Sequence, residues 1–198
     1  MIAVVFGSSG GIGRALVEAL VARDAYSHVF GISRSGADIA GAEALTADFL
    51  DDAALANVAE RIREAGQIGL CIVASGILSD GEALQPEKSF RQQSRGAFER
   101  VFAANTVAPA LIAREMLPLM PKVERSVFAA LSARVGSISD NRLGGWHAYR
   151  ASKAALNMLV RNYAIEQKRR SPGAICVALH PGTVDTGLSK PFQSGVPD

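Results

Sequence analysis

Cysteine is scarce in this chain: among its 198 residues only Cys71 and Cys176 are cysteines, and each lies within an apolar run. Two thiols buried in separate strands would form neither a disulfide framework nor a metal site. We therefore expect no bound metal and a reducing, cytoplasmic environment.

An excess of charge and long hydrophobic runs are also lacking. The formal net charge is +2, and the longest basic run is residues 168–170, so we expect no nucleic-acid partner. The longest uncharged apolar stretch, residues 101–113, contains Asn105 and Pro109. It is shorter than the roughly 20 residues that span a bilayer, and residues 1–6 do not resemble a signal peptide. We expect no membrane partner.

Short apolar runs alternate with longer amphipathic stretches along the whole chain. Continuous apolar character is typical of parallel strands that helices cover on both faces. The sequence predicts one α/β domain over residues 1–198, a Rossmann-type doubly wound parallel sheet with helices on both faces. The expected strands are Ile2–Phe6, Val29–Ser33, Ala44–Ala47, Leu70–Ala74, Ser126–Leu131 and Ile175–Leu179, and the expected helices are Arg14–Ala22, Ala53–Ala65, Gly96–Met120 and Trp146–Lys168.

Two segments between these elements are irregular. Pro109 should kink or loosen the helix over Gly96–Met120, because proline lacks the N–H that a helix uses. The polar segment Ser79–Arg95 is expected to be a loop or a short helix over the sheet edge.

A glycine-rich turn joins the first strand to the first helix. Gly7, Gly11 and Gly13 permit a tight turn, close approach of a pyrophosphate and close packing of the helix on the strand. Glycine also serves purely conformational needs in turns. The position between a buried strand and an amphipathic helix favours a dinucleotide site.

The Gly-x-x-x-Gly-x-Gly spacing resembles that of the short-chain dehydrogenase/reductase family. This resemblance implies a nicotinamide cofactor held by Gly7, Ser9, Gly11, Ile12 and Gly13. The family usually carries Thr before the first glycine, where this chain has Phe6.

The end of the second strand indicates which nicotinamide cofactor binds. Ser33 and Arg34 stand where a preference for NAD would show an acidic residue, so we expect NADP(H) rather than NAD(H). The alternative is a solvated Arg34 in a surface turn. Asp48 and Phe49 resemble the family's adenine contact, although Asp48 could equally be a helix N-cap.

A Tyr-x-x-x-Lys pair begins the last predicted helix. Tyr149 and Lys153 are four residues apart, so they share one helix face. A cation beside a phenol should depress the phenol pKa, and such a tyrosine can give a proton to a carbonyl oxygen during reduction. We expect Tyr149 to be the acid/base and Lys153 to lower its pKa and hold the nicotinamide ribose.

The family resemblance extends to three further stretches. It implies that Asn105 orders a water of a proton relay, unless that residue merely satisfies the kink before Pro109. It also implies cofactor contacts from Ala74-Ser75-Gly76 and from Pro181, Gly182, Val184 and Thr186. The first of these stretches replaces the family's Asn-Ala-Gly.

The family's catalytic serine precedes a glycine by three residues, and that position is Ala133 here. Ser132 is our candidate for polarising the carbonyl, with Ser137 as the alternative. The following Gly-Gly-Trp-His stretch resembles the C-factor-like and sniffer-like carbonyl reductases. Trp146 and His147 could line the substrate pocket, or Trp146 could pack against the core.

These observations predict an NADP(H)-dependent oxidoreductase that acts on a small carbonyl or secondary alcohol. The alternative is a cofactor-binding regulatory or signalling protein with little turnover. By resemblance to the family's dimer-forming helices we expect a homodimer or homotetramer. The sheet is expected to lack the family's usual last strand, because the sequence stops twelve residues after Thr186.

Overall fold

The computed structural model describes residues 1–182 and 184. Its strands are β1 (Ile2–Phe6), β2 (Val29–Ser33), β3 (Glu43–Thr46), β4 (Ile68–Val73), β5 (Ser126–Leu131) and β6 (Ala174–Leu179). Its helices are α1 (Gly11–Arg23), α2 (Asp52–Ala65), α3 (Arg95–Phe102), α4 (Ala108–Met116) and α5 (His147–Arg170), with short helical turns η1 (Phe90–Gln92), η2 (Ala103–Val107), η3 (Leu117–Leu119) and η4 (Arg134–Gly136).

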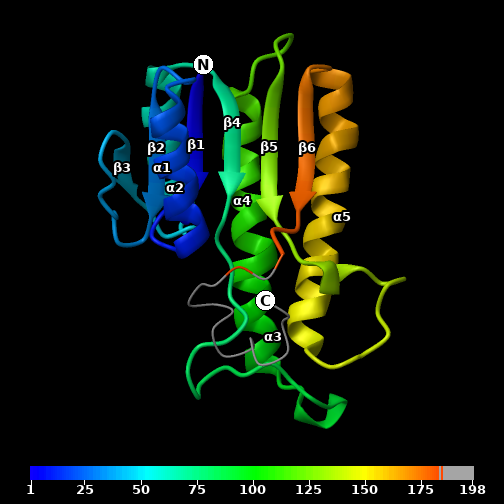
Figure 1. Ribbon diagram of the computed structural model, residues 1–198. Helices are drawn as coiled ribbons and strands as arrows, with labels where there is room; N and C mark the ends of the chain where they lie inside the picture. The colour runs from blue at the N-terminus through cyan, green and yellow to red at the C-terminus, as the bar shows by residue number, and fades with distance from the viewer. Residues whose placement is uncertain (183, 185–198) are drawn as a thin grey trace.

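All six strands form one parallel sheet in the order β3-β2-β1-β4-β5-β6. The arrowheads in Figure 1 therefore point to one edge, where the loops after β4 and β5 and the start of α5 gather. The strand order reverses between β1 and β4, which is where open α/β sheets bind ligands. The predicted Rossmann-type α/β fold is confirmed.

Helices cover the two faces of the sheet unequally. On one face α2, α4 and α5 pack on a core that includes Phe6, Phe30 and Phe128, all fully buried. On the other face α1 packs over β1 and β2 through Val17 and Leu20. This two-layered burial explains why the strands read as continuous apolar runs.

The predicted helical segment over Gly96–Met120 is confirmed, but it is not one regular α-helix. It consists of α3, then the wide π-helical turn η2, then α4 and η3. Pro109 lies in the first turn of α4, directly after η2, and lacks the N–H that would bond back into that turn. The irregularity therefore falls one turn earlier, around Asn105.

Other elements differ from their predicted bounds by a few residues at their ends. In β4, for example, the strand begins at Ile68, two residues earlier than predicted. The segment Ser79–Arg95 is a loop up to the start of α3, with η1 and isolated bridges of Asp80 to Glu82 and to Leu84 within it. Over the described residues, no helix combines the length and apolarity that a membrane span requires.

Candidate active site

Two neighbouring cavities lie at the carboxyl edge of the sheet. One, of about 570 Å³, lies beside the ends of β1 and β2, and the other, of about 360 Å³, lies between the ends of β4, β5 and β6. Ala74, Ser75 and Gly76, directly after β4, line both cavities. The two cavities therefore adjoin along this segment, at the point where the strand order reverses.

The glycine turn forms the floor between the two cavities. Gly7 has a left-handed φ of 89°, and a β-carbon there would lie 2.8 Å from the Ser75 nitrogen. A β-carbon at Gly13 would lie 2.1 Å from the Gly7 oxygen, so α1 touches the turn directly. Ser9 lines the first cavity and Ile12 the second.

The N-terminus of α1 suits an anion. No side chain caps Gly10, and the first turn, which begins at Gly11, carries no acidic residue. Its N–H groups therefore remain available to oxygen acceptors such as a pyrophosphate. The buried Ser75 hydroxyl in the same cleft has no partner among the described residues. The predicted cofactor residues of this loop thus fit a dinucleotide.

Arg34 lies at the rim of the larger cavity, with Ser33 beside it. In the described part of the chain no ion pair or hydrogen bond engages the Arg34 guanidinium, whereas the Ser33 hydroxyl accepts the Ala37 N–H at 3.1 Å. Arg34 is therefore placed to bind an anion at this rim. The Ser33 hydroxyl mainly stabilises the turn that follows β2, through its bond with Ala37.

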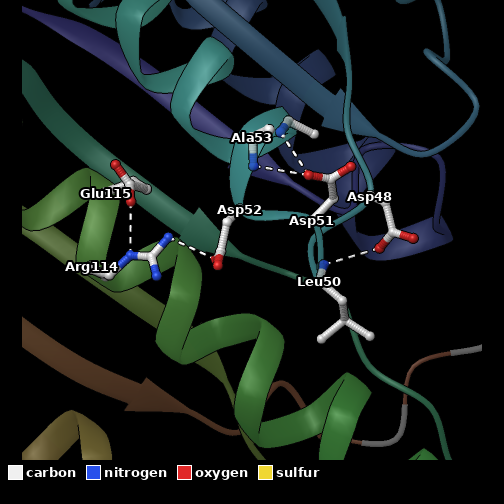
Figure 2. A network of polar contacts seen from close by, with 8 residues as sticks. Asp48, Leu50, Asp51, Asp52, Ala53, Arg114 and Glu115 are labelled. Carbon is white, nitrogen blue, oxygen red and sulfur yellow. Dashed lines mark hydrogen bonds and ion pairs between the residues drawn. The ribbon is translucent and has the colours of Figure 1, made fainter.

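Asp48 and Phe49 also line the larger cavity. Figure 2 shows that the N-cap of α2 is Asp51, whose Oδ1 accepts the N–H groups of Ala53 and Ala54. Among the described residues the Asp48 carboxylate accepts only the Leu50 N–H, so the alternative of Asp48 as the helix cap is wrong. Its second oxygen remains available to a ligand in the cavity.

Arg114 of α4 fixes the start of α2 from the other side. Its guanidinium donates to Asp52 at 2.9 Å and to Glu115 at 2.8 Å (Figure 2). This contact joins the start of α2 to α4.

Tyr149 and Lys153 both line the smaller cavity and are both buried. The Lys153 ammonium lies 5.8 Å from the centre of the Tyr149 ring and donates to the Leu131 carbonyl at 2.9 Å. Burial lowers the pKa of Lys153 to about 8 and raises that of Tyr149 above its ordinary value. The predicted depression of the Tyr149 pKa is therefore wrong in this structure, because burial of the phenol raises that pKa instead.

Asn105 is fully buried in η2, and its side chain holds three elements together. Its Oδ1 accepts the Ile77 N–H at 2.7 Å, and its Nδ2 donates to the Ile77 carbonyl at 2.8 Å and to the Ser152 hydroxyl at 3.1 Å. Ser152 in turn donates to the Tyr149 carbonyl at 2.8 Å. The side chain is thus committed to bracing the helix that carries Tyr149, which leaves the Asn105 backbone for any contact with water.

Ser152 was missed from the sequence, although it stands inside the Tyr-Arg-Ala-Ser-Lys stretch. A small hydroxyl residue in the interior of an otherwise ordinary helix is a weak signal of such a contact. The contact itself requires the π-helical turn at Asn105, 47 residues away along the chain.

Ser132 lines the smaller cavity, but its hydroxyl donates to the Asn157 Oδ1 at 2.7 Å. Ala133, next along the chain, also lines this cavity and has no hydroxyl. The alternative, Ser137, is not among the lining residues, and its hydroxyl lies 3.4 Å from that of Ser139. The role of Ser132 as carbonyl polariser stays a prediction.

The remaining wall of the smaller cavity is mostly apolar. Trp146 lines the cavity and also packs against a small cluster with Leu78 and Val135, so both of its predicted roles coexist. His147 does not line it, whereas His180 does. Pro181, Gly182 and Val184 lie on its edge, as predicted, and Thr186 lies outside the described residues.

No aspartate or glutamate lines the smaller cavity within the part of the chain that the structure describes. In the same part, no group of three or more histidine, cysteine or acidic side chains could hold a metal ion.

Comparison with known proteins places these observations in a family. A family model described as short chain dehydrogenase matches residues 1–196. The chain is 30% identical over 207 aligned positions to a benzil reductase of Saccharomyces cerevisiae that forms (S)-benzoin, with 96% of this chain and 74% of the yeast protein covered. It is also 39% identical to C-signal of Myxococcus xanthus over 92 residues, which cover 46% of this chain and about half (54%) of C-signal.

A solved structure agrees with the fold. The NADPH-bound carbonyl reductase from chicken fatty liver superposes with a TM-score of 0.79 at 25% identity, covering 94% of this chain and 77% of the other.

Proposed function

The chain belongs to the short-chain dehydrogenase family of oxidoreductases, and from this premise we propose that it is an NADP(H)-dependent carbonyl reductase acting on a small ketone, aldehyde or secondary alcohol. The observation that carries this proposal is the buried Tyr149–Lys153 pair in a cavity that adjoins the one beside the glycine turn. The names of the yeast and chicken relatives support a carbonyl substrate.

The residues that would hold the cofactor run from Arg34, past the glycine turn, to the cavity beside Tyr149. The N-terminus of α1 would bind a pyrophosphate, and Pro181, Gly182 and Val184 would lie near the nicotinamide end. When bound, the dinucleotide supplies or accepts the hydride. Thr186 belongs to this group by family resemblance only.

Tyr149 supplies the proton that the carbonyl oxygen needs as hydride reaches the carbon. A phenol whose pKa is raised by burial is fully protonated at neutral pH, so it is ready to donate. Lys153, with a pKa of about 8, is still mainly protonated at pH 7 and stabilises the phenolate left behind. Asn105 braces Tyr149 through Ser152 and orders a relay water through its backbone.

The decisive test replaces Tyr149 with Phe and follows NADPH oxidation with a panel of small carbonyls. We expect the rate to fall by about 10²–10⁴-fold while the dissociation constant for NADPH is unchanged. Tyr163→Phe, on the same helix but packed on Phe128, is the matched control and should keep the wild-type rate. Equal rates in wild type and Tyr149→Phe would contradict the assigned acid.

Arg34 is proposed to hold the 2′-phosphate that distinguishes NADP from NAD. Arg34→Ala should weaken binding of NADPH by about tenfold or more and leave NADH binding nearly unchanged, because a charge-assisted bond is lost only with the former. Arg23→Ala, an exposed arginine at the end of α1, serves as control. An equal loss of affinity for NADPH and NADH would contradict the proposed preference for NADP over NAD.

A cofactor-binding signalling protein is the second candidate. It is favoured by Ala133 in the position of the expected serine, and by the similarity to C-signal. It predicts tight NADPH binding with no turnover of any carbonyl in the panel, even in the wild-type protein.

A further inference from the structure

The loop before α5 ends in three successive left-handed residues. Gly144, Gly145 and Trp146 have φ values of 63°, 66° and 50°. The two glycines adopt this conformation freely, whereas a bulky side chain does so only at an energetic cost. Within residues 1–182 and 184, Asp24 is the one other non-glycine residue with a positive φ. Trp146 must therefore be held in place by its surroundings.

One set of contacts comes from Glu87, which is 4% exposed. Its backbone carbonyl accepts the Trp146 N–H at 2.5 Å, and its carboxylate accepts the Ala148 N–H at 3.3 Å. The charge sits at the N-terminus of α5, where a helix stabilises an anion. Glu87 thus fastens the polar loop after β4 to Trp146 itself and to Ala148 in the first turn of α5.

The second set comes from Arg150, one turn into α5. Its Nε donates to the carbonyls of Gly144 and Gly145, both at 3.1 Å, and its Nη1 donates to the Val135 carbonyl at 3.3 Å. Arg150 makes no ion pair within the described part of the chain. A positive charge near the N-terminus of a helix is unfavourable, so charge alone does not explain an arginine here. The planar guanidinium of Arg150 suits this position because its N–H groups can reach several backbone carbonyls at once.

These contacts set the indole of Trp146 against the catalytic phenol. The ring of Trp146 meets that of Tyr149 edge to face, with centroids 6.2 Å apart and planes at 73°. The indole, half-buried, lines the smaller cavity together with Leu78 and Val135. Beside the Tyr149 ring the cavity therefore offers a flat apolar surface, and no carboxylate of the described residues lines it.

We infer that Trp146 is the aromatic wall that selects carbonyl substrates bearing a flat aryl group, and that Arg150 is the positioning residue that sets this wall. The inference rests on the proposed carbonyl reductase and names the substrate class for the same cavity. Aromatic rings attract one another in offset and edge-to-face geometry, so an aryl substituent gains more from the indole than a methyl group does.

The test compares two diketones that differ only in this substituent, 1-phenyl-1,2-propanedione and 2,3-butanedione. The wild-type kcat/KM should favour the phenyl compound by at least tenfold. Trp146→Leu should lower this preference about five- to tenfold, and Trp146→Phe should retain most of it. A preference unchanged in Trp146→Leu would overturn the inference.

The substitution Arg150→Lys keeps the positive charge but removes the planar guanidinium that bonds to the three backbone carbonyls. It should lower the preference about threefold or more through KM for the phenyl compound, with kcat on 2,3-butanedione unchanged. It should also change the near-ultraviolet circular dichroism, to which Trp146, the sole tryptophan, contributes. In a Trp146→Leu background the same substitution should alter the preference no further. A merely structural role would reduce turnover of both diketones equally, and that result would refute the positioning role.

Arg142→Lys, in the same loop and exposed, is the matched control and should behave as wild type. The dissociation constants of both diketones are measured by calorimetry as well, with NADP⁺ present and absent, since no reduction occurs then. A wild-type protein that reduces neither diketone but binds the phenyl compound preferentially would refute the proposed function and support the aromatic wall. Equal dissociation constants for the two diketones would refute the role of Trp146 as an aromatic wall but would leave the proposed function untouched.

Discussion

At the scale of single residues, Lys153 and Tyr149 show how burial sets the pKa of a group that takes part in proton transfer. Both are buried ionisable groups, and burial favours the neutral form of each, so their pKa values move in opposite directions. The amine is brought toward neutral pH and the phenol is moved away from it. The spacing of the pair is visible in the sequence, but the direction of the phenol shift depends on how deeply it is covered.

The buried Lys153 predicts a pH-dependent stability. Its pKa falls from the ordinary 10.5 to about 8 on folding, so between these values the unfolded chain binds more protons than the folded one. Lys153 by itself then adds about 1 kcal/mol of stability between pH 7 and pH 9. Burial raises the thiol pKa values of Cys71 and Cys176, and this opposes the rise near pH 9. In urea unfolding, the change in stability from pH 7 to pH 9 should therefore be more positive by about 1 kcal/mol in wild type and in the exposed control Lys168→Met than in Lys153→Met.

Ala133 predicts a gain of activity. It lines the smaller cavity, and the neighbouring Ser132 directs its hydroxyl to Asn157. A hydroxyl at position 133 would add a donor for the developing negative charge on the carbonyl oxygen. Ala133→Ser should raise kcat on simple ketones about tenfold, as measured by NADPH oxidation. If Ser132→Ala abolished activity instead, Ser132 would be the polarising residue after all.

At the scale of elements, the turn η4 lies directly on α5. A β-carbon at Gly136 would come within 2.8 Å of the Lys153 β-carbon and 2.9 Å of its carbonyl carbon. The distance between the end of β5 and the Tyr149 helix is therefore set by the lack of a side chain. The sequence shows this glycine, but not that it faces a helix seventeen residues later.

This contact predicts opposite effects of two alanine substitutions. Gly136→Ala should destabilise the protein by about 1–3 kcal/mol and slow carbonyl reduction, because η4 must move away from α5. Gly96→Ala, in an open position of α3, should stabilise it by up to about 1 kcal/mol. Urea unfolding curves of the two variants measure these changes in stability. A midpoint shifted in the same direction for both variants would contradict the packing argument.

At the scale of the whole molecule, α5 and the turn before α4 leave large apolar side chains uncovered. Val107, Met158 and Ile165 are 44%, 62% and 41% exposed. Met158 and Ile165 are seven residues apart, so they lie on the same side of α5. Exposed apolar side chains on neighbouring helices are typical of surfaces that bind another subunit.

We therefore predict a homodimer or homotetramer that uses these helices. Sedimentation at micromolar concentration should show an oligomer for wild type and a smaller species for Met158→Lys. Val123→Lys, which replaces an even more exposed side chain in the turn before β5, should leave the oligomer intact. A wild-type protein that sediments only as a monomer would remove this prediction.

The sequence alone determined the order of strands and helices, the glycine turn and the shared face of Tyr149 and Lys153. Each of these depends on residues close together in the chain, through apolar periodicity, backbone freedom or the helical repeat. Only the tertiary structure decided that Asn105 braces Ser152, that the Ser132 hydroxyl meets Asn157 and that Trp146 stands against Tyr149. Those outcomes depend on how the loops and helices pack at the sheet edge, because the direction of a side chain there is set by neighbours distant in sequence.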